Sequence, residues 1–306
     1  MPIPPNRPVA LLAYPGASRA ALEGLDEMLT HAGRLCARRG LPVPVPVRVG
    51  PDLPARRFDA VVVPPAFGSL AYLTPDPALA AWIAGQRAGG ALIASACAGA
   101  FYLGAAGLLD GRRATTHWAL ADRLAARYPA ARVEPERVTL TDGPVLTAGG
   151  LFSWIDLGHE LIARLAGTAV MREVGRFFVL DTGRRDQRLY RPAPQGRDHA
   201  DAAVRRAQEA MEADPARPWR IADLARLAAL SERSLHRRFA AATGRSPLDC
   251  LAALRMAAAQ DLLADTGTPV DTVAERVGYA NTDAFRRAFA RHTGQAPSAY
   301  RRHLRR

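Results

Sequence analysis

The sequence predicts an α/β protein with two domains, an amino-terminal α/β sandwich built on a mostly parallel sheet and a smaller all-α domain. Three observations support this prediction. The chain has 306 residues, which suits two cores of ordinary size. Its first 180 residues alternate short β-rich runs with alanine-rich helical runs. Its last hundred residues show apolar spacing of helical period and almost no β-rich run.

The β-rich runs of the first domain predict buried strands, and the alanine-rich runs predict the helices between them. The strands are expected at residues 8–14, 43–49, 59–65 and 91–96. The helices are expected at residues 20–40, 76–90 and 118–128, and two more short strands should flank Asp142 and Gly143. Strand–helix alternation requires crossover connections, so helices should cover both faces of a parallel sheet. We therefore expect a flavodoxin-like sandwich over residues 1–180.

Residues 181–199 break this pattern. Arginine, proline and glycine are frequent there, and no hydrophobic period is visible, which is typical of a linker. The expected organisation is therefore a domain over residues 1–180, a basic linker over 181–199 and a helical domain over 200–306.

The helical domain contains an internal repeat, because residues 233–251 align with residues 283–301 at an offset of fifty. Leu235 and Phe239 fall on Phe285 and Phe289. A short amphipathic helix precedes each copy, at residues 221–230 and 269–279, and a tight turn with an N-cap candidate, Ser231 or Asn281, follows it. Two helices joined by a short turn follow the helix-turn-helix plan, which is used here twice.

The second helix of each copy should bury its apolar residues and project its polar ones. The residues expected to project are Arg233, His236 and Arg237 in the first copy and Asp283, Arg286 and Arg287 in the second. One such helix would be explained equally well by a solvated face, but two copies with matched turns, caps and cores favour a pair of recognition helices. The helix predicted between them, residues 247–265, is about 28 Å long, and successive major-groove faces are about 34 Å apart.

The charge of the chain points to an anionic partner. The net charge is +12, and all 41 basic residues are arginine. Residues 200–306 hold 18 arginines against 12 acidic residues, a net charge of +6. A genomic bias towards arginine codons explains the absence of lysine, whereas the position of the charge favours double-stranded DNA. Nonspecific DNA binding is the alternative to sequence-specific binding.

The tail "VAERVGYANTDAFRRAFARHTGQAPSAYR" closely resembles the AraC/XylS family of transcription regulators. The resemblance covers about the last 100 residues. It implies two helix-turn-helix motifs that are joined by a long helix and read promoter DNA. Carried over by position, the base-reading candidates are Arg233, His236 and Arg237, then Asp283 and Arg287.

The stretch "LIASACAGAFYLG" places Cys97 on a sharp strand-to-helix turn, a common position for a nucleophile. Together with "GRRATTHW", it resembles the PfpI/ThiJ-like, class I glutamine amidotransferase-like domain of GlxA-type members of the AraC family. In enzymes of that fold, a cysteine acts with a histidine and usually with a carboxylate. Cys97 and His117 match the first two positions.

The matching acidic position is where the chain departs from those enzymes. Ser18 and Ala21 occupy it, which leaves Glu23 and Glu27 as imperfect substitutes. We therefore assign no catalytic residue and expect a ligand-sensing pocket that includes Cys97, Ala98 and His117, since ligands in α/β sheets bind at the carboxyl ends of strands. The resemblance implies an amino acid or a quaternary amine as the effector, and a homodimer. A structural remnant, or a cysteine-dependent amidase or glyoxalase-like enzyme fused to the DNA-binding module, are the alternatives.

Cofactors and metals are not expected. The three cysteines, Cys36, Cys97 and Cys250, are odd in number and match no zinc-ligand spacing. The longest apolar runs are shorter than a membrane span, and no signal segment is visible at the start of the chain, so we expect a cytoplasmic protein with no membrane partner.

Overall fold

The computed structural model describes residues 6–180, 187, 199–265 and 267–304. The chain divides into two compact units, Met1–Gln187 and Arg188–Arg306. Of the predicted linker, 181–199, only Gln187 and His199 are among the described residues. No helix in the described part of the chain is both long enough and apolar enough to cross a membrane.

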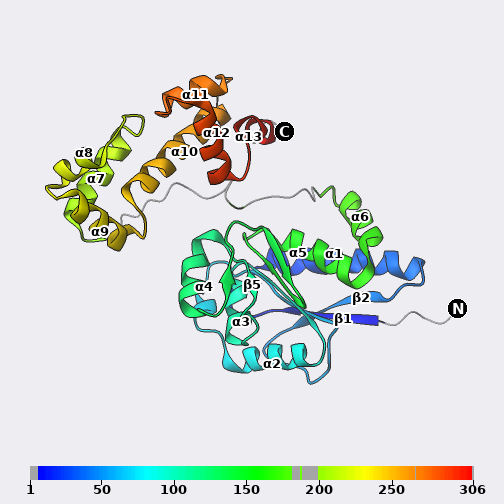
Figure 1. The fold of residues 1–306 in the computed structure, drawn as a ribbon. Coiled ribbons are helices and arrows are strands. Elements are labelled where there is room, and N and C mark those ends of the chain that lie inside the picture. Colours follow the sequence, from blue (N-terminus) through cyan, green and yellow to red (C-terminus); the bar gives the residue numbers. More distant parts are fainter. Residues whose placement is uncertain (1–5, 181–186, 188–198, 266, 305–306) are drawn as a thin grey trace. The chain divides into compact units, whose positions relative to one another are not determined.

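The first unit is the predicted α/β sandwich (Figure 1). Its six-stranded sheet has the order β2-β1-β3-β4-β8-β7, and only β7 is antiparallel to its neighbour. The strands are β1 (Asn6–Leu12), β2 (Val43–Val49), β3 (Ala60–Val63), β4 (Leu92–Ala96), β7 (Thr139–Asp142) and β8 (Val145–Ala148). All six confirm strands that the sequence predicts. A second, two-stranded sheet of β5 (Arg113–Ala114) and β6 (Arg132–Val133) was not predicted.

Helices cover both faces of this sheet, as crossover connections require. On one face lie α1 (Arg19–Arg38), α5 (Trp154–Ala166) and α6 (Thr168–Phe177). On the other lie α2 (Pro77–Ala88), α3 (Ala100–Ala105) and α4 (Ala121–Arg127), with the short 3-10 turns η1 (Ala71–Leu73), η2 (Cys97–Gly99) and η3 (Trp118–Leu120). Successive residues of β1 alternate between the two cores: Val9 and Leu11 pack under α1, while Ala10 and Leu12 pack under α2.

The second unit consists of seven described helices. They are α7 (Ala202–Ala213), α8 (Ile221–Ala228), α9 (Glu232–Thr243), α10 (Pro247–Asp265), α11 (Val270–Arg276), α12 (Thr282–Thr293) and α13 (Pro297–Leu304). α8 with α9, and α11 with α12, form the two predicted helix-turn-helix motifs. Each motif has its own apolar core, and α10 contributes Leu251 to the first and Met256 and Leu263 to the second. The predicted connecting helix therefore serves as a shared wall.

Polar contacts join the two motifs within this unit. Arg255 on α10 donates hydrogen bonds to the carbonyl oxygens of Pro215 and Arg217, 2.8 and 2.9 Å away, and its guanidinium lies over the Tyr279 ring. Gly278 packs directly on the Ala216 carbonyl, so the turn of the second motif rests on the loop between α7 and α8. These contacts fix the spacing of the two motifs.

Candidate functional site

The two recognition helices begin and end in the same way, fifty residues apart. Ser231 caps α9 by accepting a hydrogen bond from the Ser234 N–H, and Asn281 caps α12 by accepting one from the Ala284 N–H. Each helix ends at a glycine in the left-handed region, Gly244 or Gly294. Both predicted N-caps are confirmed, so both helices start in the register that the sequence implies.

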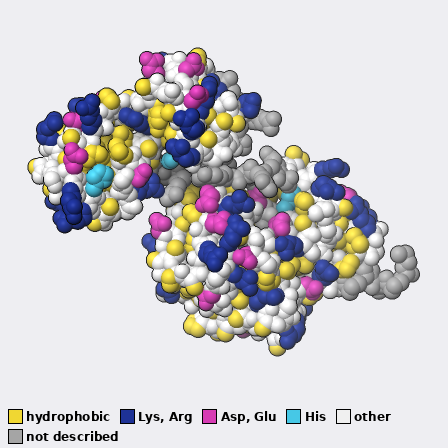
Figure 2. All heavy atoms as spheres, viewed as in Figure 1, with side chains coloured by type: hydrophobic (Ala, Val, Ile, Leu, Met, Phe, Trp, Pro, Cys, Tyr) yellow, Lys and Arg dark blue, Asp and Glu magenta, His cyan; other side chains and the backbone are white. Residues whose placement is uncertain are grey.

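The predicted DNA-facing residues of each copy lie together at the surface. Leu235 and Phe239 on α9, and Phe285 and Phe289 on α12, are fully buried. All six predicted residues are exposed: Arg233, His236 and Arg237 on α9 and Asp283, Arg286 and Arg287 on α12. In the second copy, Arg286 is held by Asp283 in an ion pair of 3.1 Å. Figure 2 shows that arginines lie at the surface of both units rather than on the helical unit alone.

In the first unit, Cys97 lies on a strained elbow between β4 and α3. Its φ angle of 53° is unusual for a residue other than glycine. Gly99 makes this turn sterically feasible, because a Cβ atom there would lie 2.5 Å from the Val63 carbonyl oxygen. The Thr116 hydroxyl donates a hydrogen bond of 2.7 Å to the Cys97 carbonyl and so fixes the elbow from the other side.

The environment of Cys97 disfavours the thiolate. Burial raises the pKa of the Cys97 thiol to about 11, and a hydrogen bond from the Ala98 N–H offsets this only in part. Since the thiolate is the reactive form, the thiol is a poor nucleophile near neutral pH. Ala98 is also buried, so neither residue offers an open surface.

His117 does not activate Cys97 in this structure. Nδ1 of His117 accepts a hydrogen bond of 3.1 Å from the Ala119 N–H, so the histidine acts as the cap of η3. Burial lowers the pKa of His117, and its ring packs against Trp118. Among the described residues, no hydrogen bond joins His117 to Cys97. The hydroxyl of Thr116, the residue before His117, is bonded to the Cys97 carbonyl.

The residues near the expected acidic position have other roles. Ser18 is the N-cap of α1 and accepts a hydrogen bond from the Ala21 N–H. Glu23 forms an ion pair of 2.7 Å with Arg48. The described residues include no group of three His, Cys, Asp or Glu side chains that could hold a metal.

A pocket of about 150 Å³ opens at the carboxyl ends of β1 and β2, beside the elbow. Its walls include Tyr14, Tyr102 and Asp76, and the rest of its lining is mainly aliphatic. The two tyrosine rings lie 4.6 Å apart, and Tyr14 Oη donates a hydrogen bond of 2.7 Å to the Pro64 carbonyl. Burial, and then the neighbouring Tyr102 and Cys97 side chains, raise the pKa of Tyr14. Tyr14, Tyr102 and Cys97 belong to one buried cluster. The pocket lining does not include Cys97, Ala98 or His117.

Gln187 is a further residue at the elbow, and the sequence gives no sign of it. Its Nε2 donates to the carbonyl oxygens of Thr116 and Arg137, at 2.9 and 2.8 Å, and its Oε1 accepts from the Trp118 N–H. The side chain is 3% exposed and packs against Gly149, where a Cβ would collide with it. Gln187, which lies in the expected linker, thus binds the residues on either side of His117.

Comparison with known proteins agrees with both halves of this description. The helix-turn-helix domain family matches residues 224–303, and the DJ-1/PfpI family matches residues 32–164. The chain is 32% identical over 216 residues to the HTH-type transcriptional regulator GlxA of Rhizobium meliloti, a match that covers 70% of this chain and 66% of that one. It is 30% identical over 248 residues to the HTH-type transcriptional regulator CdhR of Pseudomonas aeruginosa, covering 80% of this chain and 72% of that one.

The chain belongs to the AraC-type transcription regulators that carry a DJ-1/PfpI domain. It is therefore a DNA-binding regulator. One similar protein is an enzyme: isonitrile hydratase of Pseudomonas putida is 38% identical over 112 residues, which cover 36% of this chain and 46% of that one. Both regulators match far more of the chain than this enzyme does.

For this AraC-type regulator, the resemblance that the sequence suggested is confirmed in both domains. The roles of individual residues remain predictions. The structure brings each set of three polar residues onto one face of its recognition helix, whereas it does not pair Cys97 with His117. The sequence analysis did not identify Asp76, Tyr102 or Gln187. For Asp76 alone there is a local signal, since an aspartate followed by proline is typical of the start of a helix.

Proposed function

We propose that this AraC-type regulator reads promoter DNA by direct contacts from α9 and α12, and that a small molecule bound in the α/β domain controls this binding. One observation carries the DNA-reading part. Two helices with N-caps, glycine ends, buried residues and exposed residues at matching positions pack against opposite halves of α10, fifty residues apart in the sequence. Successive major-groove faces require such a spaced pair.

The proposed base contacts come from Arg233, His236 and Arg237 on α9 and from Asp283, Arg286 and Arg287 on α12. Arginine can pair with guanine through two hydrogen bonds, which gives specificity beyond simple charge attraction. We further propose that the regulator acts as a homodimer, in the cytoplasm, where bacterial promoter DNA lies.

The effector is proposed to be an amino acid or a quaternary amine that enters the pocket beside the elbow. Asp76 is the one acidic side chain among the residues lining this pocket, and two tyrosines, Tyr14 and Tyr102, also line it. A carboxylate together with aromatic faces attracts an ammonium group. Cys97 and Ala98 would then form the buried floor behind Tyr14, and His117 would border the elbow through Thr116.

The enzymatic alternative is not favoured. A cysteine-dependent amidase or glyoxalase-like reaction needs a thiolate and a base, whereas burial raises the pKa of Cys97 to about 11 and His117 caps a helical turn. Only a partial match relates the chain to isonitrile hydratase. We therefore propose a sensing role for this elbow rather than turnover.

Direct base readout predicts that Arg237→Ala and Arg287→Ala each weaken promoter binding by about 1–3 kcal/mol, as for lost base contacts. The measurement is an equilibrium titration with the duplex that the parent protein selects from a random-sequence pool, followed by footprinting. Arg123→Ala, an exposed arginine on α4 of the other domain, removes the same charge and should leave the affinity unchanged.

If both α9 and α12 variants protect the same duplex as tightly as the parent, these helices do not read the DNA. If they weaken binding to every duplex equally, binding is nonspecific and the proposed base contacts are wrong.

The effector proposal predicts that a quaternary amine or an amino acid raises the unfolding temperature of the parent protein by several degrees, because a ligand at 100 times its Kd stabilises by about 2.7 kcal/mol. Choline, betaine and arginine are suitable probes. Asp76→Asn should abolish the shift while keeping α2 capped, since asparagine caps as well as aspartate and the Ala78 N–H needs only an oxygen acceptor.

Cys97→Ala tests whether the ligand lies at the elbow rather than beside Asp76. A shift that survives in Asp76→Asn but disappears in Cys97→Ala would place the ligand at the elbow itself. The absence of a shift with every probe would count against an amine or amino acid effector.

A further inference from the structure

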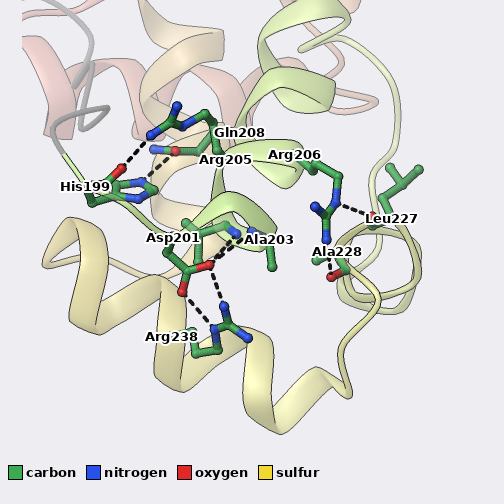
Figure 3. A network of polar contacts seen from close by, with 10 residues as sticks. His199, Asp201, Ala203, Arg205, Arg206, Gln208, Leu227, Ala228 and Arg238 are labelled. Carbon is green, nitrogen blue, oxygen red and sulfur yellow. Dashed lines mark hydrogen bonds and ion pairs between the residues drawn. The ribbon is translucent and has the colours of Figure 1, made fainter.

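Arg238 occupies a central position on the first recognition helix but points away from the exposed face. It follows Arg237 and precedes the fully buried Phe239. Its guanidinium makes two hydrogen bonds to one carboxylate: Nε donates to Asp201 Oδ2 at 2.8 Å and Nη2 donates to Asp201 Oδ1 at 2.7 Å (Figure 3). Paired, parallel hydrogen bonds of this kind fix both distance and orientation.

Asp201 has two roles at once, because it is also the N-cap of α7. Its Oδ1 accepts from the Ala203 and Val204 N–H groups, each at 3.1 Å. The hydrogen bond from Arg238, with help from these backbone donors, lowers the pKa of Asp201 to about 2. The carboxylate is therefore ionised at any ordinary pH and holds the start of α7 and the middle of α9 together.

The chain on either side of Asp201 is fixed to the same scaffold. Nε2 of His199 lies 2.9 Å from Oε1 of Gln208, and Arg205 donates to the His199 carbonyl at 2.7 Å. On the far side of α7, Arg206 donates to the carbonyl oxygens of Leu227 and Ala228, at 3.4 and 3.1 Å, where α8 ends (Figure 3). α7 thus holds both helices of the first motif through charged side chains.

The second motif lacks this attachment at the matching position. Fifty residues after Arg238 lies Ala288, which packs against the apolar core of the second motif. Its recognition helix instead carries the internal Asp283–Arg286 pair. At this position, therefore, the first recognition helix has an arginine that binds the start of α7, and the second has an alanine that cannot.

We propose that Asp201 and Arg238 are positioning residues for DNA reading: their pair sets the pose in which α9 presents Arg233, His236 and Arg237 to the first half-site. Arg238 itself contacts neither a base nor a phosphate. Because Asp201 lies two residues after His199, the described end of the linker, the pair also ties the start of the domain to α9. This inference rests on the proposed DNA reading by α9.

The decisive variant is Asp201→Asn, which keeps a capping oxygen for α7 but removes the charge that holds Arg238. Removal of a negative charge from a DNA-binding domain should by itself strengthen binding. Positioning predicts the opposite, roughly tenfold weaker binding, comparable to one lost base contact. The weakening should be confined to the half-site that Arg237→Ala identifies in the footprint, with protection of the α12 half-site retained. Glu209→Gln, an exposed acid on α7, is the charge-matched control and should not weaken binding.

Arg238→Gln tests whether this arginine touches DNA. A phosphate contact would reduce the slope of log K against log salt by about 0.9, whereas a positioning residue lowers the affinity and leaves the slope unchanged. The double variant should bind no more weakly than either single variant, because each removes the same pair.

Three results would overturn the inference: a reduced salt slope for Arg238→Gln, equal weakening at both half-sites, or undiminished binding by Asp201→Asn. If Arg237→Ala weakens binding and Asp201→Asn does not, the positioning role alone is wrong. If neither weakens it, reading by α9 is wrong as well.

Discussion

Replacing Phe289 by alanine is expected to destabilise the DNA-binding domain by about 3–5 kcal/mol, the usual cost of deleting a buried phenylalanine ring. Phe289 is fully buried and lies at the centre of an aromatic cluster, with ring centroids 5.6 Å from Phe285 and 5.4 Å from Tyr300. A domain of this size is stable by only about 5–15 kcal/mol, so the loss removes a large part of the total.

The measurement is urea unfolding of the intact protein, with hydrogen exchange used to assign the transition to α11–α13. Leu248→Ala is the control in the same domain, since Leu248 is 48% exposed, and it should change the free energy of unfolding by less than about 0.5 kcal/mol. A cost below about 1 kcal/mol for Phe289→Ala would show that this cluster does not hold α12 in place.

Gly278→Ala is expected to be nearly as damaging, for two separate reasons. Gly278 has a φ angle of 82°, and a residue with a Cβ atom there costs about 1–2 kcal/mol. The new Cβ would also lie 2.3 Å from the Ala216 carbonyl oxygen, and such overpacking costs a further 1–3 kcal/mol or so. Because this contact joins the two motifs, we expect the variant to lose promoter affinity as well as stability.

Gly244→Ala isolates the first cause, the left-handed backbone conformation. Gly244 has a φ angle of 70° but has no atom near the position of a new Cβ, so only the backbone penalty of about 1–2 kcal/mol applies. Thermal unfolding of the two variants gives the comparison directly. If Gly278→Ala costs no more than Gly244→Ala, the contact with Ala216 does not brace the two motifs.

Local features of the chain were predictable because they depend on neighbours a few residues apart. The helical period placed α10 at residues 247–265, as observed. The short polar side chains of Ser231 and Asn281 marked the starts of α9 and α12, because a side-chain oxygen there can pair with an unsatisfied N–H of the first turn. The repeat at an offset of fifty then gave the second motif from the first.

One turn residue was beyond sequence reasoning. Ala229 ends α8 in the left-handed region, with a φ angle of 54°, where glycine is usual and where Gly278 serves in the second motif. Nothing in the alanine side chain favours this conformation. It occurs where α8 and α9 share one apolar core and where Arg206 donates hydrogen bonds to the two preceding carbonyl oxygens, those of Leu227 and Ala228.

The sequence by itself determined the two-domain class, the parallel sandwich, the paired helix-turn-helix motifs and the residues that α9 and α12 expose. Each follows from periodicity, capping chemistry and repetition, which act over short distances along the chain. Only the tertiary structure decided that His117 caps a turn instead of activating Cys97, that a pocket opens against Asp76 and Tyr102, and that Arg238 binds Asp201, 37 residues away. Such contacts depend on where the crossovers carry the chain and how side chains are oriented there, and no local pattern encodes either.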